Sequence, residues 1–128
     1  MQRKKVLQAL FLLLLILVLL TVLWIGAGVG LLYYNKHLSP PARLRDQVRL
    51  GQQYQAVSEL FTRYKEKYRN DPNVSIGEGV TDKRTADALK ISQGKYLYLF
   101  HSIFVDNLQL TVYFDDSEKV AYINFVGD

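Results

Sequence analysis

Apolar positions along this chain form one long run, which is followed by shorter periodic patterns. The run from Ala9 to Tyr34 contains no charged residue, and Thr21 is its one clearly polar member. About 20 consecutive apolar residues in a helix cross the hydrocarbon core of a bilayer. The pattern therefore predicts a single transmembrane helix over residues 6–34, preceded by a basic tail at residues 1–5.

A helical period appears next, between Gln52 and about Arg69. Its apolar and aromatic positions recur at spacings of three and four residues, which is typical of one buried helix face: Tyr54, Val57, Leu60, Phe61, Tyr64 and Tyr68. Residues 70–79 contain Pro72 and two glycines and are predicted to be a loop. Residues 81–89 are predicted to form a short helix that begins near Thr81 or Asp82.

The remaining pattern is extended. Residues 96–105 are rich in aromatic and branched side chains, residues 108–114 alternate between apolar and polar positions, and residues 120–126 alternate again. Short polar turns between these stretches predict an antiparallel meander of three strands. The expected fold is α+β: a small two-layer domain of one or two helices on this sheet, over residues 51–128. Residues 35–50, which contain Pro40 and Pro41, are expected to be a basic linker.

Two stretches of the predicted domain resemble a known family. Residues 48–57, VRLGQQYQAV, followed by Leu60, look like the glycine-then-helix opening of the SmpA/OmlA (BamE-like) domain, and residues 110–120, LTVYFDDSEKV, are similar to its closing hairpin. The resemblance implies a domain of two helices and three strands with a role in outer-membrane assembly. Members of that family carry a lipidated cysteine, whereas this chain has no cysteine and begins with an apolar helix.

Charge is distributed unevenly. Residues 1–69 hold eleven basic and three acidic residues, whereas residues 70–128 hold five basic and nine acidic residues. Basic charge beside the apolar run suits anionic lipid headgroups, and a nucleic-acid-binding domain would itself be basic, so membrane lipid is the expected partner and nucleic acid is not. The residues expected at the membrane interface are Trp24, Tyr33, Tyr34, Lys36, Arg43, Arg45 and Arg49. Residues 42–50 fit either a solvated basic linker or a collar on lipid headgroups.

Orientation follows from the basic tail. Arg3, Lys4 and Lys5 abut the apolar run and favour a cytoplasmic amino terminus, which places the domain on the periplasmic or extracellular side of the membrane. A cleaved signal peptide is the alternative. The apolar run is longer than the 7–15 residues typical of such peptides, which favours a retained single-pass anchor.

Glycines inside the apolar run suggest a contact between helices. Gly26 and Gly30 have the GxxxG spacing that lets a second helix approach closely. This spacing predicts association through the membrane helix, with another copy of the chain or with a larger membrane protein complex. Small residues are also simply common in membrane helices.

No set of residues predicts catalysis, a cofactor or a bound metal. His37 and His101 lack metal-ligand spacing, and His101 is expected to pack locally within a strand. The carboxylates of Asp115, Asp116 and Glu118 fall in a predicted turn, where a solvated turn is favoured over a weak calcium site. The chain is therefore not expected to be an enzyme.

Two functional hypotheses remain. The leading one is an interaction or accessory subunit that binds or stabilises a larger membrane or cell-envelope complex. The alternative is a membrane-anchored domain that senses a ligand or binds lipid. The candidate partner or ligand face consists of Tyr96, Tyr98 and Phe100. A closed apolar cavity between helix and sheet would favour the alternative, and a filled core would count against it.

Overall fold

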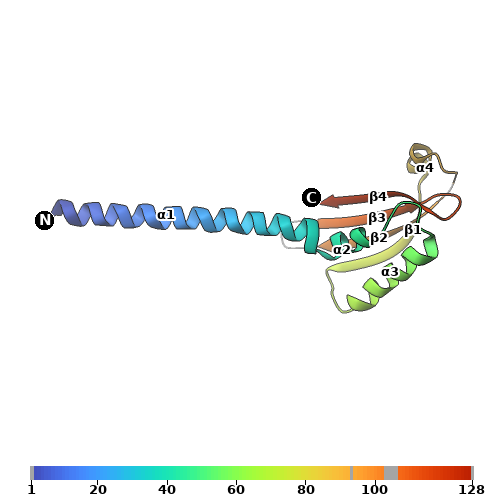
Figure 1. Cartoon of the computed structure of the whole chain (residues 1–128), viewed down its shortest axis with the longest axis horizontal. Helices are drawn as coiled ribbons and strands as arrows, with labels where there is room; N and C mark the ends of the chain where they lie inside the picture. Colours follow the sequence, from blue (N-terminus) through green and yellow to red (C-terminus); the bar gives the residue numbers. More distant parts are fainter. Residues whose placement is uncertain (1, 93, 103–106, 128) are drawn as a thin grey trace. The chain divides into compact units, whose positions relative to one another are not determined.

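The computed structural model describes residues 2–92, 94–102 and 107–127 and divides the chain into two compact units, residues 1–34 and residues 35–128 (Figure 1). The first unit consists of a single helix, α1 (Gln2–Tyr33). The second unit contains the other helices and the strands that the structure describes.

Helix α1 has 32 residues and is about 48 Å long at 1.5 Å per residue. None of its described residues is buried, and by length and composition it can cross a membrane. The hydroxyl of Thr21 donates a hydrogen bond to the carbonyl oxygen of Leu17 at 2.8 Å, so this polar group is satisfied within the helix. The predicted helix is therefore present, and it has no apolar face that is packed within the chain.

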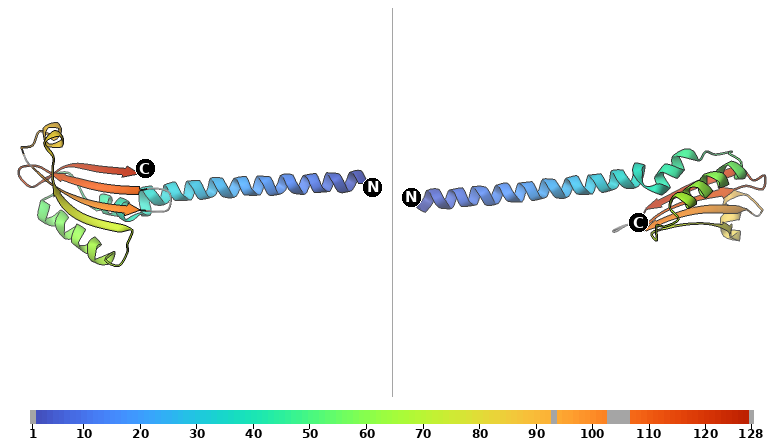
Figure 2. Two further views of the ribbon diagram at one scale, coloured as in Figure 1. Left: turned by 180° about the vertical axis from the view of Figure 1, so that it is seen from behind. Right: turned by 90° about the horizontal axis from the view of Figure 1, so that it is seen from below.

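The second unit is a four-stranded antiparallel sheet with helices on both sides. The described elements that follow α1 are η1 (Tyr34–Leu38, a π-helical turn), α2 (Pro40–Gln47), α3 (Tyr54–Lys67), β1 (Val74–Val80), α4 (Lys83–Leu89), β2 (Lys95–Ser102), β3 (Asn107–Phe114) and β4 (Val120–Gly127). The strands lie in the order β1-β2-β3-β4, so neighbours in the sheet are also neighbours in sequence. Helices α2 and α3 cover one face, and α4 lies at one end of the sheet on its other side (Figure 2).

The α+β fold class is confirmed, but the sheet has four strands instead of the predicted three. The additional strand, β1, spans Val74–Val80. It overlaps residues 70–79, whose glycines indicated a loop. Gly77 and Gly79 are paired with Tyr98 and Tyr96 of β2, whose rings cover them. A neighbouring aromatic ring supplies the packing that a strand glycine lacks, which is why this sequence forms a strand here.

The core lies between the sheet and the two covering helices. Residues 108–114 alternate as predicted, and Leu108, Leu110, Val112 and Phe114 are at most 1% exposed. The predicted apolar stripe of α3 is also confirmed, because Val57 and Phe61 are buried against the sheet. The core cluster consists of Leu44, Val48, Val57, Phe61, Leu97, Leu99, Leu110, Val112, Phe114 and Val120.

Residues 35–50 differ from the expected linker because α2 is part of the folded unit. Ser39 caps this helix, with its hydroxyl accepting a hydrogen bond from the Ala42 N–H, and Pro40 and Pro41 occupy the first turn. Proline is tolerated there because the first helical N–H groups have no partner within the helix. Leu44 is fully buried, and its side chain belongs to the core cluster.

The segment after α2 joins the last strand. The Gly51 N–H donates to the Val120 carbonyl at 2.9 Å, and the Val120 N–H donates to the Gln52 carbonyl at 2.8 Å. Gly51 has φ +81°, a conformation that favours glycine. The beginning of the second unit is therefore hydrogen-bonded to its last strand.

The short helix predicted at residues 81–89 is confirmed as α4. The carboxylate of Asp82 accepts a hydrogen bond from the Thr85 N–H at 3.2 Å and caps the helix. Lys90 ends the helix in a left-handed conformation with φ 59°. The strand predicted over residues 96–105 and the turn expected after it lie partly outside the described residues.

Candidate interaction surface

The face of the sheet opposite α2 and α3 is rich in aromatic residues. On β2, side chains alternate between this face and the face that the helices cover. Leu97, Leu99 and His101 point toward the helices and are buried. The alternate positions Tyr96, Tyr98 and Phe100, which formed the predicted partner or ligand face, therefore share the opposite side of the sheet and are half-buried.

Strand register adds two further tyrosines to this surface. Tyr96 pairs with Tyr113 of β3, and Tyr113 pairs with Tyr122 of β4, so one row of three tyrosines crosses three strands. Ring centroids are 6.3 Å apart for Tyr96 and Tyr98, 5.8 Å for Tyr96 and Tyr113, and 6.0 Å for Tyr113 and Tyr122. We call Tyr96, Tyr98, Phe100, Tyr113 and Tyr122 the tyrosine face.

The tyrosine face carries no charged strand residue among the described positions. Its neighbours on the same side of the sheet are small, amide or hydroxyl side chains with one valine: Ser75, Gly77, Gly79, Ser102, Asn107, Gln109, Thr111, Asn124 and Val126. The Gln109 side-chain amide donates a hydrogen bond to the Thr111 hydroxyl at 3.2 Å. The surface therefore combines apolar rings with neutral hydrogen-bonding groups.

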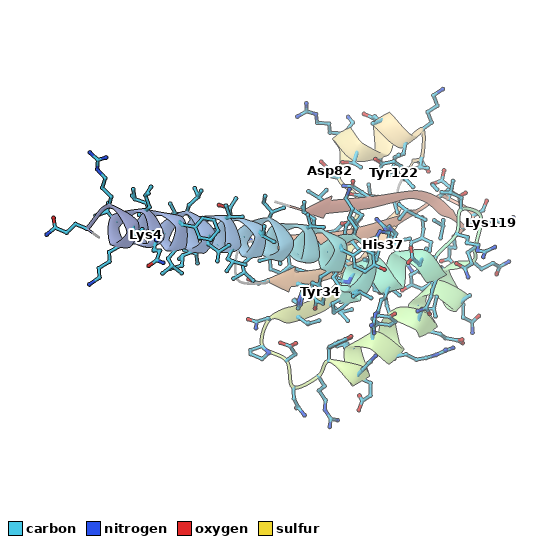
Figure 3. All side chains as sticks on the ribbon, turned by 60° about the vertical axis from the view of Figure 1, so that its left-hand side comes forward. Lys4, Tyr34, His37, Asp82, Lys119 and Tyr122 are labelled. Atoms are coloured by element: carbon cyan, nitrogen blue, oxygen red, sulfur yellow. The ribbon has the colours of Figure 1, made fainter. Side chains whose placement is uncertain are left out.

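One tyrosine of this face has a shifted pKa. Burial raises the pKa of Tyr113 above its ordinary value, and the nearby Tyr96, Asp82 and Tyr122 raise it further. The hydroxyl therefore stays protonated at neutral pH and can donate a hydrogen bond. Figure 3 marks two of these neighbours of Tyr113, Asp82 at the start of α4 and Tyr122 on β4.

Exposure differs across the tyrosine face. Tyr122 is 46% exposed, and the neighbouring Val126 on the same strand is 44% exposed. Tyr113, Tyr96 and Tyr98 are shielded in part by one another and by the glycines of β1. On this side of the sheet, the most accessible described apolar side chains therefore lie on β4.

Three members of the tyrosine face, Tyr96, Tyr98 and Phe100, were predicted from the sequence, and two were not. Tyr113 and Tyr122 alternate with core residues in the sequence, so their side of the strand could be predicted. Their position beside Tyr96 depends on the pairing register, which the alternation does not reveal.

The residues predicted at a membrane interface have different environments. Trp24, Tyr33 and Tyr34 are exposed on the apolar helical segment. Lys36, Arg43 and Arg49 are exposed in the second unit, whereas Arg45 is half-buried. The Arg45 guanidinium lies 4.6 Å from the Phe125 ring centroid and donates to the Lys36 carbonyl at 2.9 Å. Arg45 therefore has a structural role, because its guanidinium already contacts groups within the domain.

The predicted helix-packing residues Gly26 and Gly30 lie on open helix surface. A Cβ atom built on either glycine, or on Gly28 between them, meets no atom within 4 Å. Among the described residues nothing packs against this stretch.

The acidic turn between β3 and β4 uses its carboxylates for local structure. Asp115 accepts hydrogen bonds from the N–H groups of Ser117 and Lys119, and Asp116 accepts from the N–H and hydroxyl of Ser92. Glu118 lies 3.8 Å from the Lys95 ammonium. Across the described residues no group of three or more His, Asp or Glu side chains could hold a metal ion.

His101 is 7% exposed on the core side of β2, between Val74 and Leu108 of the neighbouring strands. Burial lowers its pKa, and the nearby Asp71 opposes this shift. The buried Nδ1 atom has no hydrogen-bond partner among the described residues.

The space between helices and sheet is filled by the core side chains, five of which are 0% exposed: Leu44, Val57, Leu99, Leu110 and Val112. A groove of about 710 Å³ lies at the start of α3, and its lining includes Gln53, Ser58 and Glu118. This groove is open and is lined by polar and apolar surface in similar measure. A filled core was the observation expected to count against a domain that encloses a ligand.

Comparison with protein-family models, with curated proteins and with solved structures finds no match for this chain. The resemblance to the SmpA/OmlA domain therefore stays a prediction. The fourth strand departs from the three strands that the resemblance implies.

Proposed function

We propose that this chain is a single-pass membrane-anchored interaction subunit, and that its tyrosine face binds a protein of a larger membrane or cell-envelope complex. The observation that carries the proposal is the tyrosine face itself, an aromatic surface without strand charges on the side of the sheet that α2 and α3 leave open. The centres of protein interfaces are depleted of charge and enriched in tyrosine.

The composition of the tyrosine face specifies the chemistry of the partner. The strands of this face supply no charge that could compensate a charged group for the loss of its water, so a strongly charged partner is disfavoured. Tyrosine rings contribute large apolar area, and their hydroxyls together with Gln109 and Asn124, which are not buried, offer hydrogen bonds. The fitting partner is a neutral protein surface that mixes apolar and hydrogen-bonding groups.

The anchor supports the same function. Helix α1 is exposed along its length and apolar, and it carries the basic tail at one end. We place the amino terminus in the cytoplasm and the domain on the opposite side of the membrane. Lys36, Arg43 and Arg49 are then available to anionic headgroups, with about 1 kcal/mol of attraction for each basic residue near the surface.

Site-specific photocrosslinking in intact membranes tests the proposal. A photoreactive phenylalanine analogue at Tyr98 or Tyr122 should capture a defined integral membrane or envelope protein. The same analogue at Glu59 or Lys65, exposed on α3, is the matched control and should not capture it. Capture must be followed by direct binding of the purified partner to the full chain in detergent.

Substitution then decides between surfaces. Tyr122→Lys should weaken that binding at least tenfold, because it places a charge in the neutral interface, whereas Glu59→Ala should leave it unchanged. Equal capture from α3 and the tyrosine face, or binding that is indifferent to Tyr122→Lys, would overturn the proposal.

Single cysteines test the orientation, because the natural chain has none. A membrane-impermeant maleimide should label Ser117→Cys in intact cells, or in cells whose outer membrane has been opened. It should label Gln2→Cys only after the inner membrane is lysed. The reverse pattern would show that the domain faces the cytoplasm.

A further inference from the structure

The two edges of the sheet differ in how well they are protected from pairing with another strand. At the β1 edge, Glu78 lies in the middle of the strand, and Tyr54 of α3 donates a hydrogen bond to its carboxylate at 2.8 Å. A charge and a nearby helix are two of the usual protections of an exposed edge.

The β4 edge is closed at its start, where Val120 is hydrogen-bonded to Gly51 and Gln52. Helix α2 contacts β4, but the strand itself carries no protective residue. Its eight residues, VAYINFVG, include no charge and no proline, and the strand is rich in branched and aromatic side chains. Within the sheet that the structure describes, β4 is paired with β3 alone. Beyond Val120, the outer edge of a strand with this composition is a template for another strand.

The charge pattern of β4 fits pairing with a second copy of the same strand. In a symmetric antiparallel pair, each residue lies opposite a residue of the same strand in the other copy, so any charge risks meeting a like charge. β4 contains no charge and meets this condition in every register. We propose that β4 pairs antiparallel with β4 of a second copy, which joins the two four-stranded sheets into one of eight strands.

This pairing also accounts for the exposed side chains at the edge. Directly opposite residues in an antiparallel pair point to the same side of the sheet, so the tyrosine faces of both copies lie on one side. Tyr122 and Val126, nearly half exposed in the single chain, then lie beside the other copy. The proposal does not rest on the proposed function, because it concerns pairing between two copies of this chain and requires no other protein.

The first test measures the mass of the purified full-length chain in detergent micelles by light scattering across a dilution series. The natural chain should be a dimer that dissociates on dilution. Val126→Lys and Tyr122→Lys, at exposed positions where the folded domain tolerates a change, should raise the dissociation constant at least tenfold. Ser75→Lys, on the outward side of β1, is the matched control and should leave the dimer intact.

The second test maps the register with introduced cysteines. Copies that carry single cysteines at Tyr122, Asn124 or Val126 are mixed in pairs and oxidised. Only pairs whose residue numbers add to one constant should form a disulfide, because an antiparallel two-fold pairing fixes that sum. Ser75→Cys, on the other edge, should not crosslink.

Several outcomes would overturn the proposal. The first is a monomer at every concentration. The second is a dimer that Ser75→Lys dissociates as readily as Val126→Lys does. The third is disulfide formation between cysteines whose residue numbers do not add to one constant. A dimer that resists Val126→Lys but is lost on replacing Gly26 and Gly30 with leucine would assign the contact to α1 and overturn it also.

Discussion

The ring of Tyr98 lies over Gly77, its partner on β1, so closely that a Cβ atom added to Gly77 would lie 2.5 Å from the Tyr98 hydroxyl oxygen. Tyr96 covers Gly79 in the same way. These two pairs explain how a strand with glycines at alternate positions joins the sheet, and they make the tyrosines part of the stability of β1 as well as of its surface.

The Tyr98–Gly77 pair should show strong coupling. Tyr98→Ala should lower the free energy of unfolding by about 1 kcal/mol, because Gly77 loses its cover. Gly77→Ala should stabilise the Tyr98→Ala variant but not the natural chain, in which the new methyl group meets the ring. Urea unfolding of the full chain in detergent, followed by near-ultraviolet circular dichroism, gives the four values. Additivity of the two changes would show that the ring does not protect Gly77, and Tyr122→Ala with Gly77→Ala is the additive control.

Leu44 tests whether α2 belongs to the domain. Because the side chain is fully buried among the core residues, Leu44→Ala should destabilise the domain by about 2–5 kcal/mol. Leu50→Ala, at a 68% exposed leucine nearby, should change stability by less than about 0.5 kcal/mol. If thermal unfolding showed equally small losses of stability for Leu44→Ala and Leu50→Ala, residues 35–50 would be a linker and not part of the domain.

Arg45 should differ from the other arginines of its segment. Its guanidinium contacts the Phe125 ring and the Lys36 carbonyl, so Arg45→Ala should cost about 1–2 kcal/mol of stability. Arg43→Ala and Arg49→Ala should leave stability within about 0.5 kcal/mol, because both side chains are exposed. Urea midpoints measured at matched ionic strength check the ranking. A loss from Arg43→Ala as large as that from Arg45→Ala would contradict it.

His101 makes the domain sensitive to acid. Its pKa in the folded state lies below its ordinary value of about 6.5, so the unfolded chain binds a proton more readily than the folded one. Its contribution to stability is complete above pH 6.5 and is lost as the pH falls from there toward the folded-state pKa, at no more than about 1.4 kcal/mol per pH unit.

His101→Leu should flatten this part of the stability profile, while other carboxylates of the domain still titrate at lower pH. The matched control is His37→Leu, at the chain's other histidine, which is exposed. Thermal midpoints measured from pH 7.5 to pH 5 provide the test. If the His101→Leu profile keeps the slope of the natural chain, His101 is not the group responsible.

The acidic turn should be structural and indifferent to calcium. Asp115→Ala removes two backbone hydrogen bonds and should cost about 1–2 kcal/mol. Asp116→Ala frees the Ser92 N–H and hydroxyl and should cost about 1 kcal/mol. Millimolar calcium should leave the thermal midpoint of the natural chain unchanged. A rise that Asp115→Ala abolishes would instead reveal a metal site.

Elements with strong apolar periodicity were predictable from the sequence. The alternation from Leu108 to Phe114 and the stripe that includes Val57 and Phe61 each specify a buried face by local spacing alone, and both are confirmed. The α+β class follows from the same patterns, since a helix and alternating strands must cover one another.

Features that depend on distant partners were not predictable. β1 is a strand because rings from β2 cover its glycines, and the sequence of β1 alone does not predict these contacts. Helix α2 contains two prolines and two arginines, and Leu44 is its only long apolar residue. Its sequence therefore shows no apolar periodicity that would predict a buried helix. Tyr113 and Tyr122 join Tyr96 through the pairing register, which is a property of three strands together. The candidate surface was therefore predicted on β2 and missed on β3 and β4.

The hydrogen bonds between Gly51 or Gln52 and Val120 have a consequence for synthesis. The strands can pair one after another as they are made, because each hairpin is local in sequence. Gly51 and Gln52, which follow α2, are synthesised long before Val120 and can make these hydrogen bonds only when β4 is present. The domain therefore completes its fold only after β4 has left the ribosome. Stalled nascent chains should resist protease only when an added carboxyl-terminal extension is long enough to hold β4 outside the ribosome, and shorter ones should be digested.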